Sequence, residues 1–302
     1  MDPLKICLVA SEVVPFAKTG GLADVTGALG KYLSNKGHDV RVFMPYYSTL
    51  ETGKNEFHVV EYLQNVPVQF GGFTLYFTAL TAKMPDSDCD VYFIHCEGLY
   101  NRGKVYTDDA DEYLRFALLS RAAIECCQRM AWGPDIFHCN DWQTAIIPIY
   151  LKTFYKWDNL FQNSRFVYTI HNIGYAYQGV FPANFVDALM LGGYRDMLPQ
   201  EDLAAGIINY MKLGIIYTDM ITTVSPTYAQ EIQTAEYGGG LHDMLAYRKY
   251  RLVGILNGVD YQEWSPESDP LIPHNYSIKN LPGKEENKKA LLEIIPTQGF
   301  DY

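Results

Sequence analysis

The stretch that most constrains the fold is Lys18–Val25, KTGGLADV, because it joins an apolar run to an amphipathic segment. The run before it, residues 5–10, has the length and composition of a buried parallel strand. After it, Val25, Ala28, Leu29 and Leu33 recur at helical spacing, Gly37 follows where helices commonly end, and residues 40–44 form a second apolar run. The sequence therefore predicts a β-α-β unit near its start.

The two glycines of this loop predict a binding site for an anion. Gly20 and Gly21 let the backbone come close to a ligand, the helix start favours negative charge, and Lys18 adds a positive charge. The alternative is a loop in which the glycines only turn the chain and Lys18 points into solvent. The loop lacks the G-x-G-x-x-G pattern, which disfavours a dinucleotide-dependent oxidoreductase.

Composition limits the classes of partner. The 302 residues carry a net charge of -11, which argues against nucleic acid or an anionic membrane as a partner. The start of the chain has no signal-peptide pattern and no later run reaches membrane-spanning length, so we expect a cytoplasmic protein. The six cysteines lack C-x-x-C spacing, and we expect buried thiols and no structural metal.

The rest of the chain alternates strand and helix patterns without an internal repeat, which predicts a doubly wound α/β fold with a mixed sheet. A hairpin insertion is expected at Gly71-Gly72. After Val259 the composition changes to linker residues and a short charged helix at 284–293. Strands are expected at 57–63, 66–70, 73–79, 91–95, 136–139, 166–170, 219–224 and 251–256, and helices at 109–130, 141–151, 183–191, 203–217 and 226–234.

Polar residues follow predicted strands at three further places, which a parallel sheet would bring to one edge. Asp141 could accept hydroxyl groups of a ligand or simply cap the helix that follows. His171 could belong to an active site or be structural. Asn257 could contact a ligand or form an ordinary Asn-Gly turn.

The motifs as a set resemble those of the bacterial glycogen synthase and plant starch synthase family, which transfers glucose from ADP-glucose to an α-1,4-glucan. The resemblance covers essentially the whole chain, but only the N-terminal half of a full-length synthase. Gln143 stands where the family usually has histidine, and Tyr175-Ala176-Tyr177 makes its loop about two residues longer than the commonest version. The matching stretches are KTGGL at 18–22, NDW at 140–142, TIHN at 169–172, VSPTYA at 224–229, EYGGGL at 236–241 and ILNGVD at 255–260.

The resemblance implies the first Rossmann-like half of a two-domain GT-B glycosyltransferase. Residues 1–260 would form the catalytic, acceptor-side domain, and 261–302 the linker and the start of a C-terminal nucleotide-binding domain. It implies retaining transfer without a metal or other cofactor, from ADP-glucose to an α-1,4-glucan or maltooligosaccharide, in the cytoplasm or, for a plant source, in the plastid stroma. The site residues that it implies are His171, Asp141 and Lys18 as catalytic, with Glu12, Lys18, Gly20, Gly21, Asp141, His171 and Asn257 binding substrate.

Two alternatives remain beside this function. One is an isolated glucan-binding or regulatory domain without turnover, because the family's phosphate-gripping basic residues come from the second domain. The other is a synthase that uses UDP-glucose. We expect residues 1–302 to fold alone but not to synthesise glucan alone.

Overall fold

The computed structural model describes residues 2–50, 56–258 and 264–295. Contacts within it divide the chain into two units, Met1–Asn257 and Gly258–Tyr302. The sequence places the boundary at residue 260, which lies outside the described residues. The roles expected for the two parts stay predictions.

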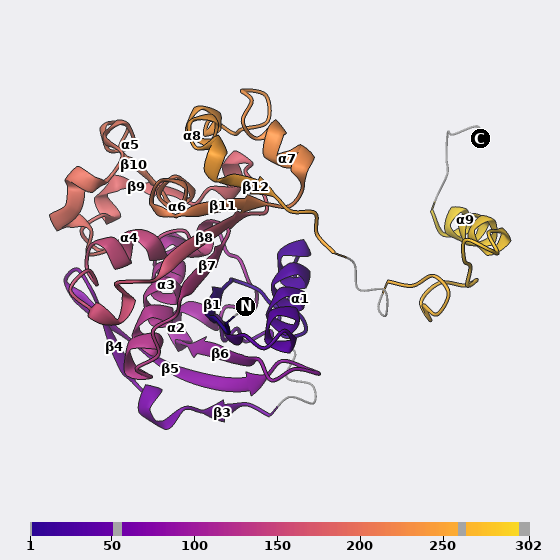
Figure 1. Cartoon of the computed structure of the whole chain (residues 1–302), viewed down its shortest axis with the longest axis horizontal. Helices are drawn as coiled ribbons and strands as arrows, with labels where there is room; N and C mark the ends of the chain where they lie inside the picture. Colours follow the sequence, from indigo (N-terminus) through magenta and orange to yellow (C-terminus); the bar gives the residue numbers. More distant parts are fainter. Residues whose placement is uncertain (1, 51–55, 259–263, 296–302) are drawn as a thin grey trace. The chain divides into compact units, whose positions relative to one another are not determined.

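The larger unit is built on one mixed sheet whose central strands are parallel (Figure 1). Its strand order is β12-β11-β8-β7-β1-β2-β6-β5-β3, and helices α1 and α3 lie on opposite sides of the central strands. The doubly wound α/β fold is confirmed. The parallel strands are β1 Lys5–Val9, β2 Asp39–Pro45, β6 Asp90–His95, β7 Ile136–Asn140, β8 Arg165–Ile170, β11 Met220–Thr223 and β12 Leu252–Gly254.

The expected hairpin lies at one edge of this sheet. Strands β4 Val66–Phe70 and β5 Phe73–Lys83 pair antiparallel across Gly71-Gly72, and β5 continues antiparallel along β6. The strand expected at 57–63 is wrong over most of its length, because β3 covers only His58–Val59 and a 3₁₀ turn, η1, follows at Glu61–Leu63.

Helix α1, Gly21–Asn35, buries a different face from the one that its large apolar residues indicate. Ala28 is exposed, whereas Gly30 is buried against β1 and β2, and Gly27 is buried against the loop that follows β1. A side chain at Gly27 would place its Cβ 2.6 Å from the carbonyl oxygen of Val14, so the close approach of the backbone decides which face turns inward. Gly37 ends the helix as expected, with φ of 91°.

Replacing Gly27 with alanine is expected to destabilise the fold by about 1–2 kcal/mol. Alanine gains up to about 1 kcal/mol of helix propensity, but the contact with a backbone oxygen costs about 1–3 kcal/mol. Urea unfolding measures the difference. Gly98→Ala is the matched control, because Gly98 lies in the short helix α2, Glu97–Tyr100, and a Cβ there meets nothing within 4 Å. An equal effect of both variants would contradict the packing argument.

Helix α3, Glu112–Arg129, is buried on nearly every side instead of along one apolar stripe. Two arginines of this helix lie inside the fold, with their guanidinium groups hydrogen-bonded. Arg115 forms an ion pair with Glu112 at 2.7 Å and donates to the carbonyl oxygens of Leu99 and Val105. Arg121 donates to the hydroxyl of Tyr155 at 3.2 Å. The hydrogen bonds of Arg115 therefore hold the segments around Leu99 and Val105 against this helix.

Several expected helices are shorter or broken. The helix expected at 141–151 splits into η2 Trp142–Thr144 and α4 Ile147–Lys152, and 203–217 splits around a strand. At 183–191 only a 3₁₀ turn forms, at Ala183–Phe185. Ser225 caps the helix that follows it, since its Oγ accepts the N–H of Tyr228 at 2.9 Å. The remaining elements are η3 Asn159–Phe161, η4 Tyr175–Tyr177, β9 Val180–Pro182, η5 Ala183–Phe185, η6 Gly192–Met197, α5 Gln200–Ala204, β10 Ile207–Asn209, α6 Tyr210–Tyr217, α7 Pro226–Glu231, α8 His242–Tyr247, η7 Lys249–Arg251 and α9 Pro282–Ile294.

All six cysteines are free and buried, as the sequence predicts. Among the described helices, none combines the length and the apolar character needed to cross a membrane.

Candidate functional site

The carboxyl ends of the parallel strands bring most of the sequence-predicted residues to one edge. Asp141 follows β7 directly and His171 follows β8, while Glu12 lies three residues beyond β1. The register aligns these ends, because Cys139 pairs with both Val9 and Tyr168. Ligands of open parallel sheets bind at this edge.

Asp141 and His171 are joined through the backbone. The Asp141 carboxylate accepts the backbone N–H of His171 at 2.7 Å and that of Asn172 at 3.4 Å. It makes no capping hydrogen bond to the helical turn that follows, so the alternative of a simple helix cap is wrong. The φ of Asp141 is 53°, a strained value for a residue with a side chain. Such strain is typical of functional sites.

Burial raises the pKa of Asp141 to about 7, and the nearby charge of Glu12 adds to this shift. The two backbone N–H groups act in the opposite direction but do not offset the burial. At neutral pH the carboxyl is therefore present in both protonation states. A group of this kind can both accept a hydrogen bond and donate one.

The imidazole of His171 is neutral and has one defined tautomer. Burial lowers its pKa to about 4, with a further contribution from His138. Its Nε2 lies 3.0 Å from Oδ1 of Asn140. The amide nitrogen of Asn140 donates to the carbonyl of Val9 at 3.2 Å, so Oδ1 is the acceptor and Nε2 of His171 carries the proton. Nδ1 is then a hydrogen-bond acceptor.

Glu12 lies inside the fold and fixes the glycine loop. Its carboxylate accepts the backbone N–H of Thr19, the hydroxyl of Thr19 at 3.1 Å and the hydroxyl of Tyr106 at 3.0 Å. Glu12 as a whole residue is 3% exposed, so most of the hydrogen bonds that its carboxylate can accept come from within the protein. The contact with Tyr106 spans 94 residues, and no motif in the sequence points to that tyrosine.

The loop presents its positive groups to solvent. Lys18 forms an ion pair with Asp24 at 2.7 Å, and both side chains are about 40% exposed. Helix α1 starts after Gly20 without a side-chain cap, so its first N–H groups lack a side-chain partner there. A Cβ at Gly20 or Gly21 would meet nothing within 4 Å, and neither has positive φ. Internal packing therefore does not require glycine at these two positions.

The loop after His171 is held in place by Gln178. Its side-chain N–H₂ donates to the carbonyls of Ile173 at 2.9 Å and Gly239 at 2.8 Å, and its oxygen accepts from Asn209 at 2.8 Å. Gly179, with φ of 64°, lies against the ring of Trp142. The glycine run at 238–240 is thus bonded to the loop that follows His171.

Two other motif residues have different surroundings. Gln143, which stands where the family usually has histidine, is 5% exposed, and its Oε1 has no hydrogen-bond partner among the described residues. Asn257 is exposed beyond β12, and its backbone N–H donates to the carbonyl of Val224 at 3.3 Å. Its side chain is therefore open to solvent.

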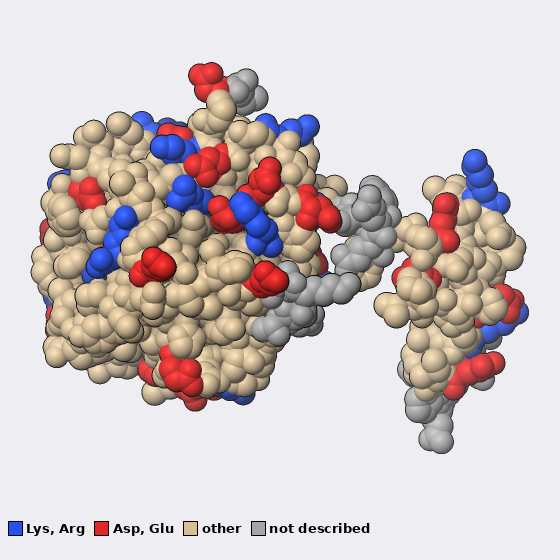
Figure 2. Space-filling view, turned by 90° about the horizontal axis from the view of Figure 1, so that it is seen from below, with Lys and Arg blue, Asp and Glu red and all other residues tan. Residues whose placement is uncertain are grey.

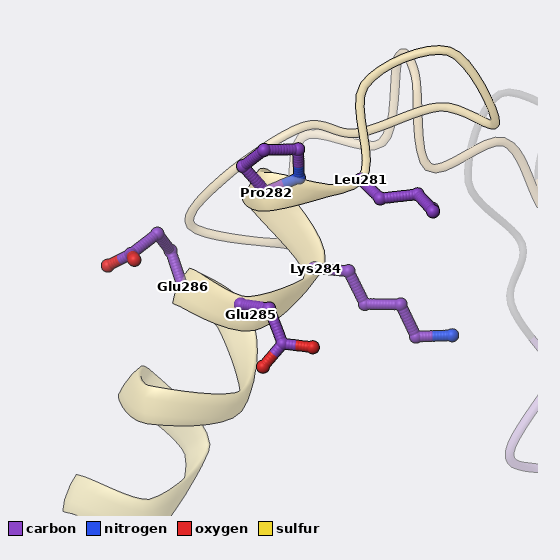
Figure 3. A pocket seen from close by; sticks show the side chains of 5 residues that line it. All are labelled: Leu281, Pro282, Lys284, Glu285 and Glu286. Atoms are coloured by element: carbon purple, nitrogen blue, oxygen red, sulfur yellow. The ribbon is translucent and has the colours of Figure 1, made fainter.

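The surface outside this edge offers weaker candidates. Figure 2 shows acidic and basic side chains interspersed over one face of the larger unit. In the smaller unit, a shallow hollow lies at the start of α9, where the side chains of Lys284 and Glu286 extend to opposite sides of the helix (Figure 3). Within the described ranges, no group of three or more His, Cys, Asp or Glu side chains is arranged to hold a metal ion.

Residues 5–247 match the family model of the starch synthase catalytic domain. The chain belongs to this family. It is 39% identical to the glycogen synthase of Thermodesulfovibrio yellowstonii, over 96% of this chain and 61% of that protein. It is 41% identical to glycogen synthase 1 of Geobacter sulfurreducens, over 96% of this chain and 58% of that protein.

A solved starch synthase has the same fold as this family member. The catalytic domain of starch synthase IV from Arabidopsis thaliana, bound to ADP and acarbose, matches with a TM-score of 0.84 and 34% identity. The match covers 100% of this chain and 61% of that chain, and it confirms the GT-B catalytic-domain architecture. The chain therefore spans about three fifths of the length of the relatives that it matches.

Proposed function

We propose that this chain is the acceptor-side part of a glycogen or starch synthase. The reaction is retaining transfer of glucose from ADP-glucose to the 4-hydroxyl at the non-reducing end of an α-1,4-glucan. The observation that carries the proposal is the pairing of Asp141 with the backbone of His171 at the carboxyl edge of the sheet. The names of the relatives support it, as do the ADP and acarbose bound to the Arabidopsis enzyme.

In this proposal, the groups around the Lys18 loop bind the anionic end of the donor. Negative charge grows on the leaving diphosphate as the bond to the anomeric carbon breaks, so positive groups fixed there lower the barrier. Lys18 and the start of α1 supply such groups, and Gly20 and Gly21 let the backbone approach the phosphate. Glu12 fixes Thr19 and so positions the loop; whether it also binds a ligand hydroxyl stays a prediction.

Asp141 and His171 hold and polarise the transferred sugar. A neutral imidazole with Nε2–H bonded to Asn140 keeps Nδ1 as an acceptor for a sugar hydroxyl. The Asp141 carboxyl fixes the backbone that carries this ring, and its charge favours the oxocarbenium character of the transition state. Asn257, exposed beyond β12, is proposed to contact the sugar nucleotide. We place the enzyme in the cytoplasm, or in the plastid stroma for a plant source.

The donor preference is open to a direct test. We expect the longest reading frame that contains this chain to transfer glucose faster from ADP-glucose than from UDP-glucose, because the matching stretches are those of the ADP-glucose-dependent family. Incorporation of radiolabelled glucose into glycogen, measured with each donor at equal concentration, gives the ratio of the two transfer rates. Equal turnover of the two donors would remove this assignment while leaving the family unchanged.

A further inference from the structure

The loop that follows His171 exposes two tyrosines between two buried residues. Tyr175 and Tyr177 are 68% and 54% exposed, whereas Ile173 before them and Gln178 after them are buried. Both tyrosines lie in the 3₁₀ turn η4, in the stretch that makes this loop about two residues longer than the commonest version in the family. The core of the protein therefore does not require these two rings.

Both ends of the loop are held by hydrogen bonds to other segments. At its start, the backbone N–H of Ile173 donates to the hydroxyl of Tyr228 at 3.1 Å. At its end, the backbone carbonyl of Gln178 accepts the N–H of Met211 at 3.0 Å. The loop therefore presents its two tyrosines from a fixed base, and a ligand that binds there orders little further chain.

The two rings differ in how they are held. The ring of Tyr177 lies against its own loop, because a Cβ added at Gly174 would lie 3.3 Å from it. The N–H of Tyr177 also donates to the carbonyl of Gly174 at 2.7 Å. The ring of Tyr175 is the more exposed of the two and projects into solvent. A ligand can therefore reach Tyr175 without displacing another part of the protein.

The chemistry of this loop fits a neutral ligand. Residues 172–182 contain no Lys, Arg, Asp or Glu, although 20% of the residues in the chain are charged. Residues 237–241, which Gln178 bonds to the loop through Gly239, contain none either. A tyrosine ring combines an apolar face with a hydroxyl group. A sugar ring has the matching features, an apolar C–H face and hydroxyl groups around its edge, so these surroundings favour a saccharide over a phosphate.

We propose that Tyr175 and Tyr177 form a stacking platform for an α-1,4-glucan, in contact with glucose units beyond the one held at His171. The inference rests on the proposed function, which supplies the class of saccharide. Tyr175 follows His171 by four residues, so their Cα atoms are at most about 14 Å apart. A glucan of a few glucose units spans this distance. One glucan chain can therefore contact both His171 and the platform.

The test is binding of residues 1–302 to glycogen, with Kd measured by affinity electrophoresis in gels that contain glycogen. Tyr175→Ala is expected to weaken binding about fivefold, the scale of losing one aromatic contact. Tyr175→Phe keeps the ring and loses only the hydroxyl, so it is expected to bind glycogen as the parent chain does.

Tyr32→Ala is the matched control. Tyr32 is 59% exposed and lies in the second half of α1, which leads from the carboxyl edge of the sheet to the opposite edge. Its replacement is expected to leave the Kd for glycogen unchanged. Because both tyrosines are exposed, urea unfolding should show that Tyr175→Ala and Tyr32→Ala fold as the parent chain does.

Two results would overturn the platform while leaving the proposed function in place. One is equal Kd values for Tyr175→Ala and Tyr32→Ala, and the other is a Tyr175→Phe variant that binds as weakly as Tyr175→Ala. In both cases the parent chain still binds glycogen. A parent chain that folds but does not bind glycogen would instead overturn the acceptor side of the proposed function, and the platform with it.

Discussion

Replacing His171 with alanine in the longest reading frame that contains this chain is expected to lower the rate of glucosyl transfer by about two orders of magnitude or more. This is the scale of losing one preorganised contact in an active site. The fold should be little affected, because the side chain lies at a strand end and its backbone N–H, which bonds Asp141, remains. Initial rates with ADP-glucose and maltooligosaccharide measure the loss.

The control for this variant is His58→Ala, which removes an exposed histidine from β3 in the hairpin region. Its rate should equal that of the parent protein. If His171→Ala keeps normal turnover, or if it simply fails to fold, His171 has a structural role and the proposed site is wrong.

Replacing Asp141 with asparagine is expected to stabilise the fold at pH 8 while lowering the rate of transfer by about tenfold or more. The pKa of Asp141 in the folded chain, about 7, lies above the ordinary carboxyl value of 3.8. The folded chain therefore holds this proton more firmly than the unfolded chain does. The stability that the protonated carboxyl contributes is complete below pH 3.8 and is lost as the pH rises through 7.

Asparagine has no such pH dependence, and its oxygen can still accept the N–H of His171. The pKa shift corresponds to at most about 4 kcal/mol, and solvent reaching the partly buried group reduces this to about 2 kcal/mol. Urea unfolding at pH 5 and pH 8 should show the advantage of Asp141→Asn growing by about 1 kcal/mol, because the rest of the change lies below pH 5. An advantage that is the same at both pH values would contradict the buried, shifted carboxyl.

The strands and the loops at their ends could be predicted because their signals are local. The apolar runs of β1, β7 and β8 mark buried parallel strands, and the topology of such sheets then places Asp141 and His171 at one edge. Gly71-Gly72 predicted the hairpin for the same reason, since a two-residue turn is specified by its own residues.

The features that the sequence did not predict depend on contacts between residues far apart in the chain. The carbonyl of Val14 lies close to Gly27, and this contact decides which face of α1 turns inward. The spacing of the large apolar residues in the sequence gives no sign of that contact. Arg115 is a charged residue inside a helix, and its burial depends on partners outside that helix, such as Leu99 and Val105. The bond from Tyr106 to Glu12 likewise closes a separation of 94 residues.

The role of Asp141 in the site also could not be predicted from local sequence. An aspartate before a helical turn is a common cap, and local sequence favours that role. The left-handed backbone at Asp141 directs its carboxylate to the neighbouring strand end instead, where it accepts the N–H of His171. Asn140 could have been found from its position beside Asp141 at the end of β7, but its bond to His171 required the sheet.

The central claim is that residues 1–302 hold the acceptor side of the site but do not complete it. Departure of the diphosphate needs several positive groups around it and exclusion of water by closure of two domains, and one domain supplies neither in full. The larger unit has its own sheet and core, so it should fold alone.

The most direct measurement compares purified residues 1–302 with the longest reading frame from the same source, using radiolabelled ADP-glucose and a maltooligosaccharide. We predict that residues 1–302 unfold cooperatively, bind the maltooligosaccharide weakly and transfer no glucose, whereas the longer protein transfers it. Robust transfer by residues 1–302 alone would contradict the claim, and so would a complete absence of maltooligosaccharide binding to the folded chain.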